Sequence, residues 1–182
     1  IYTCSSPKKL SKSPPLPLTT SGIQQLANNE LRISPKDTMR ICQKLYEAGL
    51  ITYMRTDSKT FSKKFIDSVK EYVNKNWDES YINPNADRLS IRKTNTKDVT
   101  QDAHEAIRPT DINKKIIGTP FHPREQKLYS LIWKISCSAC MSNAILNSIS
   151  AVITAPLDHE YKYTTDIVTF LGWKILDPPS DN

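Results

Sequence analysis

The sequence predicts an α+β protein that is mainly helical, and a change of pattern along the chain carries the prediction. Between residues 21 and 140, four stretches place apolar side chains at helical spacing. From residue 144 to residue 176 the pattern changes to alternation, which is typical of strands. A length of 182 residues with 38% hydrophobic residues is enough for one domain, or for one domain with a small appendage.

The first elements are an extended segment and a helix. Residues 1–18 are rich in Pro, Ser and Lys, and they predict an extended linker with a short strand at residues 1–4. A helix is expected over residues 21–31, with Ser21 as its N-cap.

The second helix has clear signals at both ends. Ser34 is the expected N-cap, Pro35 takes the first helical position, and Gly49 ends the helix where a left-handed turn needs no Cβ atom. Residues 50–55 then form a short extended segment. One face of the helix is expected to carry Thr38, Cys42, Leu45 and Tyr46.

The third helix is expected to start after the N-cap Ser62, with Phe61 packing on Ile66 as a hydrophobic staple. Residues 78–101 are polar and without a sustained period, so they predict a loop with at most a short ordered piece. The apolar stripe of this helix is Phe65, Ile66, Val69, Tyr72 and Val73.

The remaining elements complete the α+β pattern. Residues 102–107 predict one or two helical turns, stopped by Pro109. A fourth long helix runs from Pro123 to Cys140, and two or three strands follow over residues 144–176. The inward side chains of the fourth helix are Leu128, Leu131, Ile132 and Ile135.

Charge and cysteine content limit the function classes. The net charge is +6, and because residues 158–182 hold two basic and five acidic residues, the first 157 residues carry +9. Such an excess suits a polyanionic partner, although ordinary solvated surface also explains it. The four cysteines indicate a reducing, intracellular setting, and Cys137 and Cys140 are expected to be core thiols, not zinc ligands. No apolar run is long enough to span a membrane.

Two segments carry reactive side chains. The first is GLITYMRTDS (residues 49–58), which puts the Tyr53 phenol two residues from the Arg55 guanidinium. The second is DAHEAIRPT (residues 102–110), which offers an imidazole and another guanidinium. A phenol beside fixed cations is suited to attack a phosphodiester, because the hydroxyl becomes a covalent nucleophile and the cations hold the charge on phosphorus. Taken alone, the first segment favours a buried tyrosine on a strand with its arginine in a nearby salt bridge, and only the two segments together favour the reactive interpretation.

Together, these segments resemble the type IA DNA topoisomerases. The similarity includes LTTS and IQQ near residue 20, QKLYEAG (residues 43–49) and LYSLIW (residues 128–133), and it covers most of residues 14–142. Met54 and Arg108 favour the bacterial topoisomerase I branch over the topoisomerase III branch.

The resemblance implies a domain organisation. Residues 14–142 would be the helical catalytic-tyrosine domain, with a winged-helix or helix-turn-helix-like core. Residues 1–13 and 143–182 would be parts of a β-rich arch domain. We also expect the chain to be a piece of a longer protein, because it starts without Met and ends in a proline-rich stretch.

The resemblance also assigns catalytic roles. Tyr53 would form a 5′-phosphotyrosyl link, and Arg55 would hold that phosphate. His104 would lie near the scissile phosphate and interact with an acidic residue, for which Asp57 is a candidate. Glu47, one helical turn from Gln43, would orient the groups around the tyrosine.

Further DNA contacts are expected, each with a structural alternative. Thr52, Thr56 and Ser58 would donate to phosphates, or only satisfy turns. Asp57 and Gln43 belong to the same expected DNA-binding set. Arg108 would contact a DNA phosphate, or form a structural salt bridge with Glu105 or Glu47.

The resemblance further implies cofactor and partners. No metal site is expected in this chain, because Mg²⁺ in the family is bound by a separate Toprim domain, to which nothing here is similar. The expected partners are single-stranded or negatively supercoiled DNA and the remaining domains of the same polypeptide, without a membrane. The expected location is inside the cell with DNA: cytoplasm or nucleoid, or a nucleus, organelle or virion if the protein is not bacterial.

Two alternatives stay open at this point. The first alternative is a non-catalytic, basic DNA-binding module of winged-helix type, which explains the charge and the helices but not the two motifs. The second alternative is the same domain of a topoisomerase III or a reverse gyrase.

Overall fold

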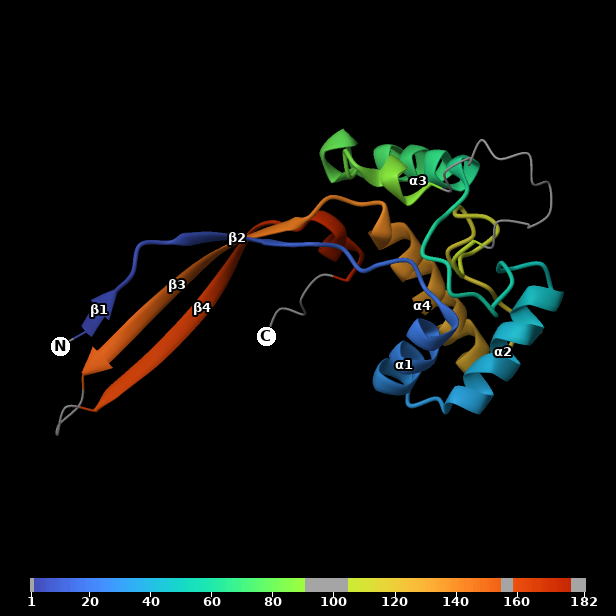
Figure 1. Cartoon of the computed structure of the whole chain (residues 1–182), viewed down its shortest axis with the longest axis horizontal. Coiled ribbons are helices and arrows are strands. Elements are labelled where there is room, and N and C mark those ends of the chain that lie inside the picture. Colours follow the sequence, from blue (N-terminus) through green and yellow to red (C-terminus); the bar gives the residue numbers. More distant parts are fainter. Residues whose placement is uncertain (1, 91–104, 155–158, 178–182) are drawn as a thin grey trace. The chain divides into compact units, whose positions relative to one another are not determined.

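A computed structural model describes residues 2–90, 105–154 and 159–177 (Figure 1). The chain divides into two compact units, one of residues 15–141 and one of residues 1–14 with 142–182. The helices lie in the first unit and the sheet in the second. The α+β prediction is therefore confirmed.

The described residues of the helical unit form four α-helices: α1 (Thr20–Leu31), α2 (Pro35–Glu47), α3 (Lys63–Asn76) and α4 (Pro123–Ala139). Helices α1, α2 and α4 pack on one another, as Figure 1 shows around the α4 label. Helix α3 packs against two 3₁₀ turns, Glu79–Tyr81 and Ala86–Leu89. The shared core is apolar and includes Ile23, Ala27, Ile41, Cys42, Leu45, Leu128 and Ile132.

The caps explain where the helices start. Ser34 Oγ accepts a hydrogen bond from the Asp37 amide at 3.1 Å, and Ser62 caps α3 in the same way, so both predicted caps are confirmed. The predicted cap Ser21 is wrong, because the N-cap of α1 is Thr19, whose hydroxyl accepts from the Gly22 amide at 3.1 Å. Each residue of the run Thr19-Thr20-Ser21 is of a type that can cap a helix. The backbone hydrogen bond from Thr20 to Thr56 fixes where the helix starts.

The sheet unit is built around a long antiparallel hairpin of β3 (Ala144–Thr154) and β4 (Glu160–Phe170). On its other edge, β3 pairs with β1 (Tyr2–Cys4) and β2 (Lys8–Lys12), both antiparallel (Figure 1). A 3₁₀ turn, Gly172–Leu176, follows β4. The strands at residues 1–4 and after residue 144 are confirmed, whereas β2 lies in the segment predicted to be a linker.

The predicted helical turn at residues 102–107 lies partly outside the described residues, and the described part is not helical. The Ile107 amide donates to Leu18 and the Ala106 amide donates to Thr60, both at 2.8 Å. These partners come from distant parts of the chain, so tertiary pairing replaces the local helix.

Candidate active site

The end of α2 fixes the backbone that leads to Tyr53. Gly49 has φ of +69°, and its amide donates to the Tyr46 carbonyl at 2.8 Å. The next amide, Leu50, donates to Leu45 at 2.9 Å. The left-handed conformation predicted for Gly49 is confirmed, and it turns the chain directly from the helix into the extended segment.

That segment is held on both sides by distant residues. On one side, the Thr52 amide donates to the Arg108 carbonyl at 2.9 Å, and the Thr110 amide donates to Leu50 at 3.0 Å. On the other side, the Thr20 hydroxyl donates to the Met54 carbonyl at 2.8 Å. Tyr53 is thus carried by a strand-like segment between two supports.

Exposure alternates along this segment as it does along a strand. Tyr53, Arg55, Asp57 and Lys59 are exposed, whereas Met54 and Thr56 are buried. Tyr53 keeps 43% of its surface accessible. Such alternation is typical of an extended chain, in which alternating residues leave on the same side, so the pattern favours one open face for the phenol and the guanidinium.

The Tyr53 ring rests against a second tyrosine. Tyr46, near the end of α2, meets it edge to face, with 5.3 Å between ring centroids and 66° between ring planes. Tyr46 was expected on the inward face with Thr38, Cys42 and Leu45, but it is 41% exposed while those three are buried. Its ring therefore packs on the Tyr53 ring and not in the core.

Glu47 and Gln43 lie on one face of α2, as their spacing predicts. Gln43 Nε2 donates to Glu47 Oε1 at 2.6 Å. The pair stands in the same stretch of α2 as Tyr46, directly before Gly49. Its spacing is confirmed, while its role in orienting catalytic groups stays a prediction.

The hydroxyls of the extended segment are engaged within the protein. Thr52 Oγ1 donates to the Ala106 carbonyl at 2.9 Å and accepts from the Arg108 amide at 3.0 Å. Thr56 Oγ1 accepts from the Ser58 amide at 3.1 Å, and Ser58 Oγ lies 2.9 Å from Thr60 Oγ1. The hydroxyls of Thr52, Thr56 and Ser58 thus bond within the protein, as the structural alternative to DNA contacts expects.

Arg108 likewise makes internal contacts. Its guanidinium bonds the Glu105 carboxylate, donates to the Pro109 carbonyl at 3.0 Å and lies 4.4 Å from the centre of the Phe65 ring. The Arg108 side chain is only 13% exposed. Burial raises the pKa of the Glu105 carboxyl, but the hydrogen bond and charge of Arg108 outweigh it, so the pKa lies below its usual value. Of the alternatives for Arg108, the structure shows the salt bridge with Glu105.

His104 lies outside the described residues, so its expected place beside the scissile phosphate and its pairing with Asp57 stay predictions. Its neighbour Ala106, however, is bonded to Thr52 and Thr60. The second motif therefore runs beside the segment that carries Tyr53.

The comparisons with known proteins bear on this arrangement. The family model described as DNA topoisomerase matches residues 1–182. DNA topoisomerase 1 of Buchnera aphidicola (subsp. Schizaphis graminum) is 36% identical over 182 residues, which is 100% of this chain and 20% of that protein. The Escherichia coli K12 enzyme of the same name is 35% identical over 174 residues, covering 94% and 19%. The chain belongs to the type IA DNA topoisomerases.

A solved structure of a topoisomerase I has a fold similar to that of this chain. Full-length topoisomerase I from Thermotoga maritima superposes with a TM-score of 0.79 at 27% identity, covering 100% of this chain and 29% of that one. The chain thus spans about a fifth of the length of the curated topoisomerases it matches.

Other groups in this topoisomerase chain are structural. Cys137 and Cys140 are buried free thiols, as predicted, and burial raises the pKa of Cys140 to about 12. Within the described residues, no three His, Cys, Asp or Glu side chains are grouped so that they can hold a metal ion. The same residues contain no helix that is long and apolar enough to cross a membrane.

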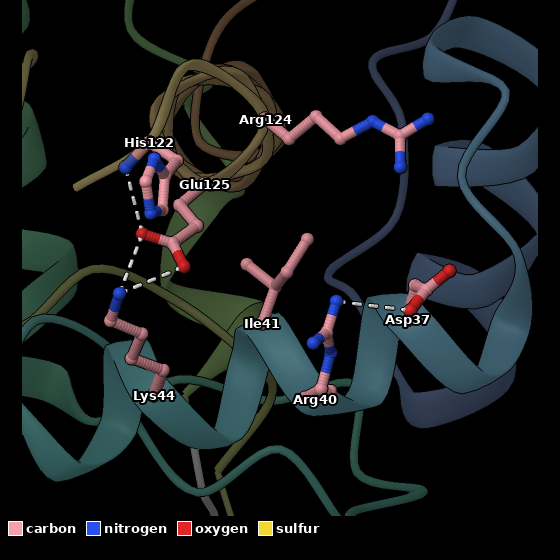
Figure 2. Close-up of a pocket in the computed structure, with 7 residues that line it drawn as sticks. All are labelled: Asp37, Arg40, Ile41, Lys44, His122, Arg124 and Glu125. Carbon is pink, nitrogen blue, oxygen red and sulfur yellow. Dashed lines mark hydrogen bonds and ion pairs between the residues drawn. The ribbon is translucent and has the colours of Figure 1, made fainter.

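Two cavities of the helical unit differ in how their cations are paired. One, of about 480 Å³, lies between α2 and the start of α4 (Figure 2). There Lys44 Nζ binds both Glu125 oxygens at 2.9 and 3.0 Å, and Arg40 pairs with Asp37 at 3.2 Å. The other, of about 770 Å³, lies beside Arg55. The sequence alone did not point to Lys59 in this cavity or to the contact between Tyr46 and Tyr53. A signal for Lys59 exists, because it continues the alternation of exposed residues that includes Tyr53, Arg55 and Asp57.

Proposed function

We propose that this chain supplies the attacking tyrosine of a type IA DNA topoisomerase. The observation that carries the proposal is the exposed Tyr53 phenol two residues from the exposed Arg55, on the short segment that follows the helix ended by Gly49. Family membership adds the substrate, a strand of DNA. The helical unit would be the catalytic-tyrosine domain and the sheet unit part of the arch.

The proposed reaction is an ester exchange. Tyr53 Oη bonds to phosphorus, the bond from phosphorus to the 3′ oxygen breaks, and that oxygen takes up a proton as the phenol loses its own. The Arg55 guanidinium holds the phosphate oxygens with two parallel hydrogen bonds. Because one phosphate ester replaces another, the break can be resealed without ATP after another strand has passed.

We assign supporting roles to the other site residues that the sequence predicts. His104 and Asp57 would act at the phosphate, and Gln43 with Glu47 would hold the end of α2 in place. Arg108, Thr52, Thr56 and Ser58 would act through the backbone that they fix. Mg²⁺ would be held by the Toprim domain of the whole enzyme and would supply charge stabilisation at the phosphate. The enzyme would act inside the cell, on negatively supercoiled DNA.

The test is Tyr53→Phe in the full-length enzyme that contains this chain. Removal of one oxygen is expected to abolish covalent capture of DNA and relaxation, and to leave DNA binding nearly intact. Capture is measured as protein linked to labelled DNA on a denaturing gel. Tyr163→Phe, which changes an exposed tyrosine in the sheet unit, is the matched control and is expected to capture DNA normally.

A Tyr53→Phe enzyme that still captured DNA would show that another residue is the nucleophile. If the unchanged protein bound DNA but formed no covalent link to it, the alternative of a non-catalytic DNA-binding module would gain support. A helicase domain in the full-length gene would instead place the chain in a reverse gyrase.

A further inference from the structure

A groove runs beside the proposed scissile-phosphate site, between the start of α1 and the extended segment after Tyr53. Its volume is about 770 Å³, and it is open to solvent. Two exposed cations, Arg55 and Lys59, stand on the segment that forms one wall. The full lining is Thr19, Thr20, Ser21, Gln24, Arg55, Thr56, Asp57 and Lys59.

The two walls of the groove are fixed to each other by Thr20. The Thr20 amide donates to the Thr56 carbonyl at 2.9 Å, and the Thr56 amide donates to Thr20 Oγ1 at 2.9 Å. The same hydroxyl donates to the Met54 carbonyl at 2.8 Å. Since Arg55 lies between two anchored residues, the groove and the Tyr53 segment form one rigid piece.

Both cations of this groove are available, whereas two of the three cations that line the α2–α4 cavity are not. Among the described residues, neither Arg55 nor Lys59 takes part in an ion pair, whereas Arg40 and Lys44 are both paired with carboxylates (Figure 2). Asp57 is the one carboxylate in the groove, so the lining keeps a net positive charge. An anion is therefore attracted to the groove by the two cations.

The separation of Arg55 and Lys59 along the groove decides whether they bind one phosphate or two. Arg55 and Lys59 are four residues apart, so their Cα atoms can lie up to about 13 Å apart. Both side chains line the groove. The two cations therefore reach separate phosphates of one strand more easily than they share one.

We propose that this groove binds the backbone of the cleaved DNA strand beyond the scissile phosphate, with Lys59 on a neighbouring phosphate and Gln24 on the opposite wall. The proposal rests on the proposed function, because it takes Arg55 as the contact to the scissile phosphate. The ligand is a single-stranded polynucleotide, recognised by its phosphates and not by its bases.

The first test compares Lys59→Gln with Lys127→Gln in this chain, using a fluorescein-labelled oligothymidylate at several salt concentrations. Lys127 is an exposed lysine on α4 that lines a different cavity, so both variants lose the same charge. For Lys59→Gln, the slope of log affinity against log salt is expected to fall in magnitude by about 0.7, the value of one single-strand phosphate contact. Equal slopes for the two variants would overturn the proposal.

The second test uses two neighbouring glutamines of α1. Gln24 lines the groove, whereas Gln25 is exposed and is not part of the lining. Gln24→Glu is expected to weaken oligothymidylate binding more than Gln25→Glu, although each adds one negative charge at adjacent positions of the same helix. Equal weakening would mean that net charge, and not this groove, holds the strand.

These outcomes are separate from those of the Tyr53→Phe test. If Tyr53→Phe abolishes covalent capture but Lys59→Gln matches its control, the groove proposal fails and the proposed function stands. If Tyr53→Phe still captures DNA while Lys59→Gln loses a phosphate contact, the groove is confirmed as a DNA site and the assignment of the nucleophile fails.

Discussion

Arg55 and Arg108 show how position separates two guanidiniums of similar appearance in the sequence. Arg108 is bonded to Glu105, stacked on Phe65 and almost buried. Arg55 stands exposed on the Tyr53 face. At the residue scale, the proposed chemistry therefore belongs to Arg55, whereas the backbone of Arg108 pairs the second motif with Thr52 of the first.

Arg55→Lys is expected to slow DNA cleavage by the full-length enzyme at least about tenfold. Lysine keeps the charge but loses the paired hydrogen bonds, and one such contact is worth about 1.5–3 kcal/mol. Single-turnover cleavage of a labelled oligonucleotide measures the effect. Arg124→Lys, an exposed position on α4, serves as the control. Wild-type cleavage by Arg55→Lys would place that guanidinium away from the phosphate.

Tyr46→Ala is expected to reduce the cleavage rate by about two- to tenfold, because an edge-to-face ring pair contributes about 0.5–1.5 kcal/mol and here positions the nucleophile. Tyr46→Phe keeps the ring and is expected to cleave at nearly the normal rate. The same kinetic assay compares the two. A rate loss that is as large for Phe as for Ala would assign the effect to the Tyr46 hydroxyl and not to ring packing.

The sequence was sufficient for some site residues and not for others. The exposed positions of Tyr53 and Arg55 could be predicted, because alternation along an extended segment depends only on local geometry, while their catalytic roles stay predictions. The partner of Arg108 could not be decided, since Glu105 and a DNA phosphate both satisfy a guanidinium. The contact of Tyr46 depends on the turn at Gly49 and was missed for that reason.

At the scale of helices and strands, the elements with strong local sequence signals were predicted well. Helices α2 and α3 start at Ser34 and Ser62 because a hydroxyl cap and an apolar stripe act together. Strand β2 has only one apolar residue, Leu10, and its pairing with Leu146 on β3 decides its conformation. Residues 105–107 are likewise extended because distant backbone groups bind them.

Gly49→Ala tests whether the turn after α2 positions the nucleophile. A Cβ atom at Gly49 meets nothing within 4 Å, so the cost is the left-handed backbone alone, about 1–2 kcal/mol. Urea unfolding is expected to show a lower midpoint, and cleavage by the full enzyme is expected to fall. Gly118→Ala, also with open space and without a positive φ, is expected to be neutral or slightly stabilising. Equal midpoints for the two variants would contradict the argument.

At the scale of the whole molecule, the chain holds the proposed nucleophile and cations and spans about a fifth of the length of its relatives. Its described residues offer no group of carboxylates that can hold a metal ion. We propose that the site is one half of a shared active site, whose other half would come from the remaining domains of the full-length enzyme.

The isolated chain is accordingly expected to bind single-stranded DNA weakly, with affinity that falls as salt rises, because phosphate contacts release counterions. It is expected not to relax negatively supercoiled plasmid at any Mg²⁺ concentration. In the proposed enzyme, strand passage would need a gate that opens and closes around the broken strand, and cleavage would need the metal-binding carboxylates of another domain. Gel electrophoresis of plasmid incubated with the chain and Mg²⁺ measures relaxation, with the full-length enzyme as the positive control. Relaxation by the chain alone would show that its own residues form a complete active site, and that the two-part site is wrong.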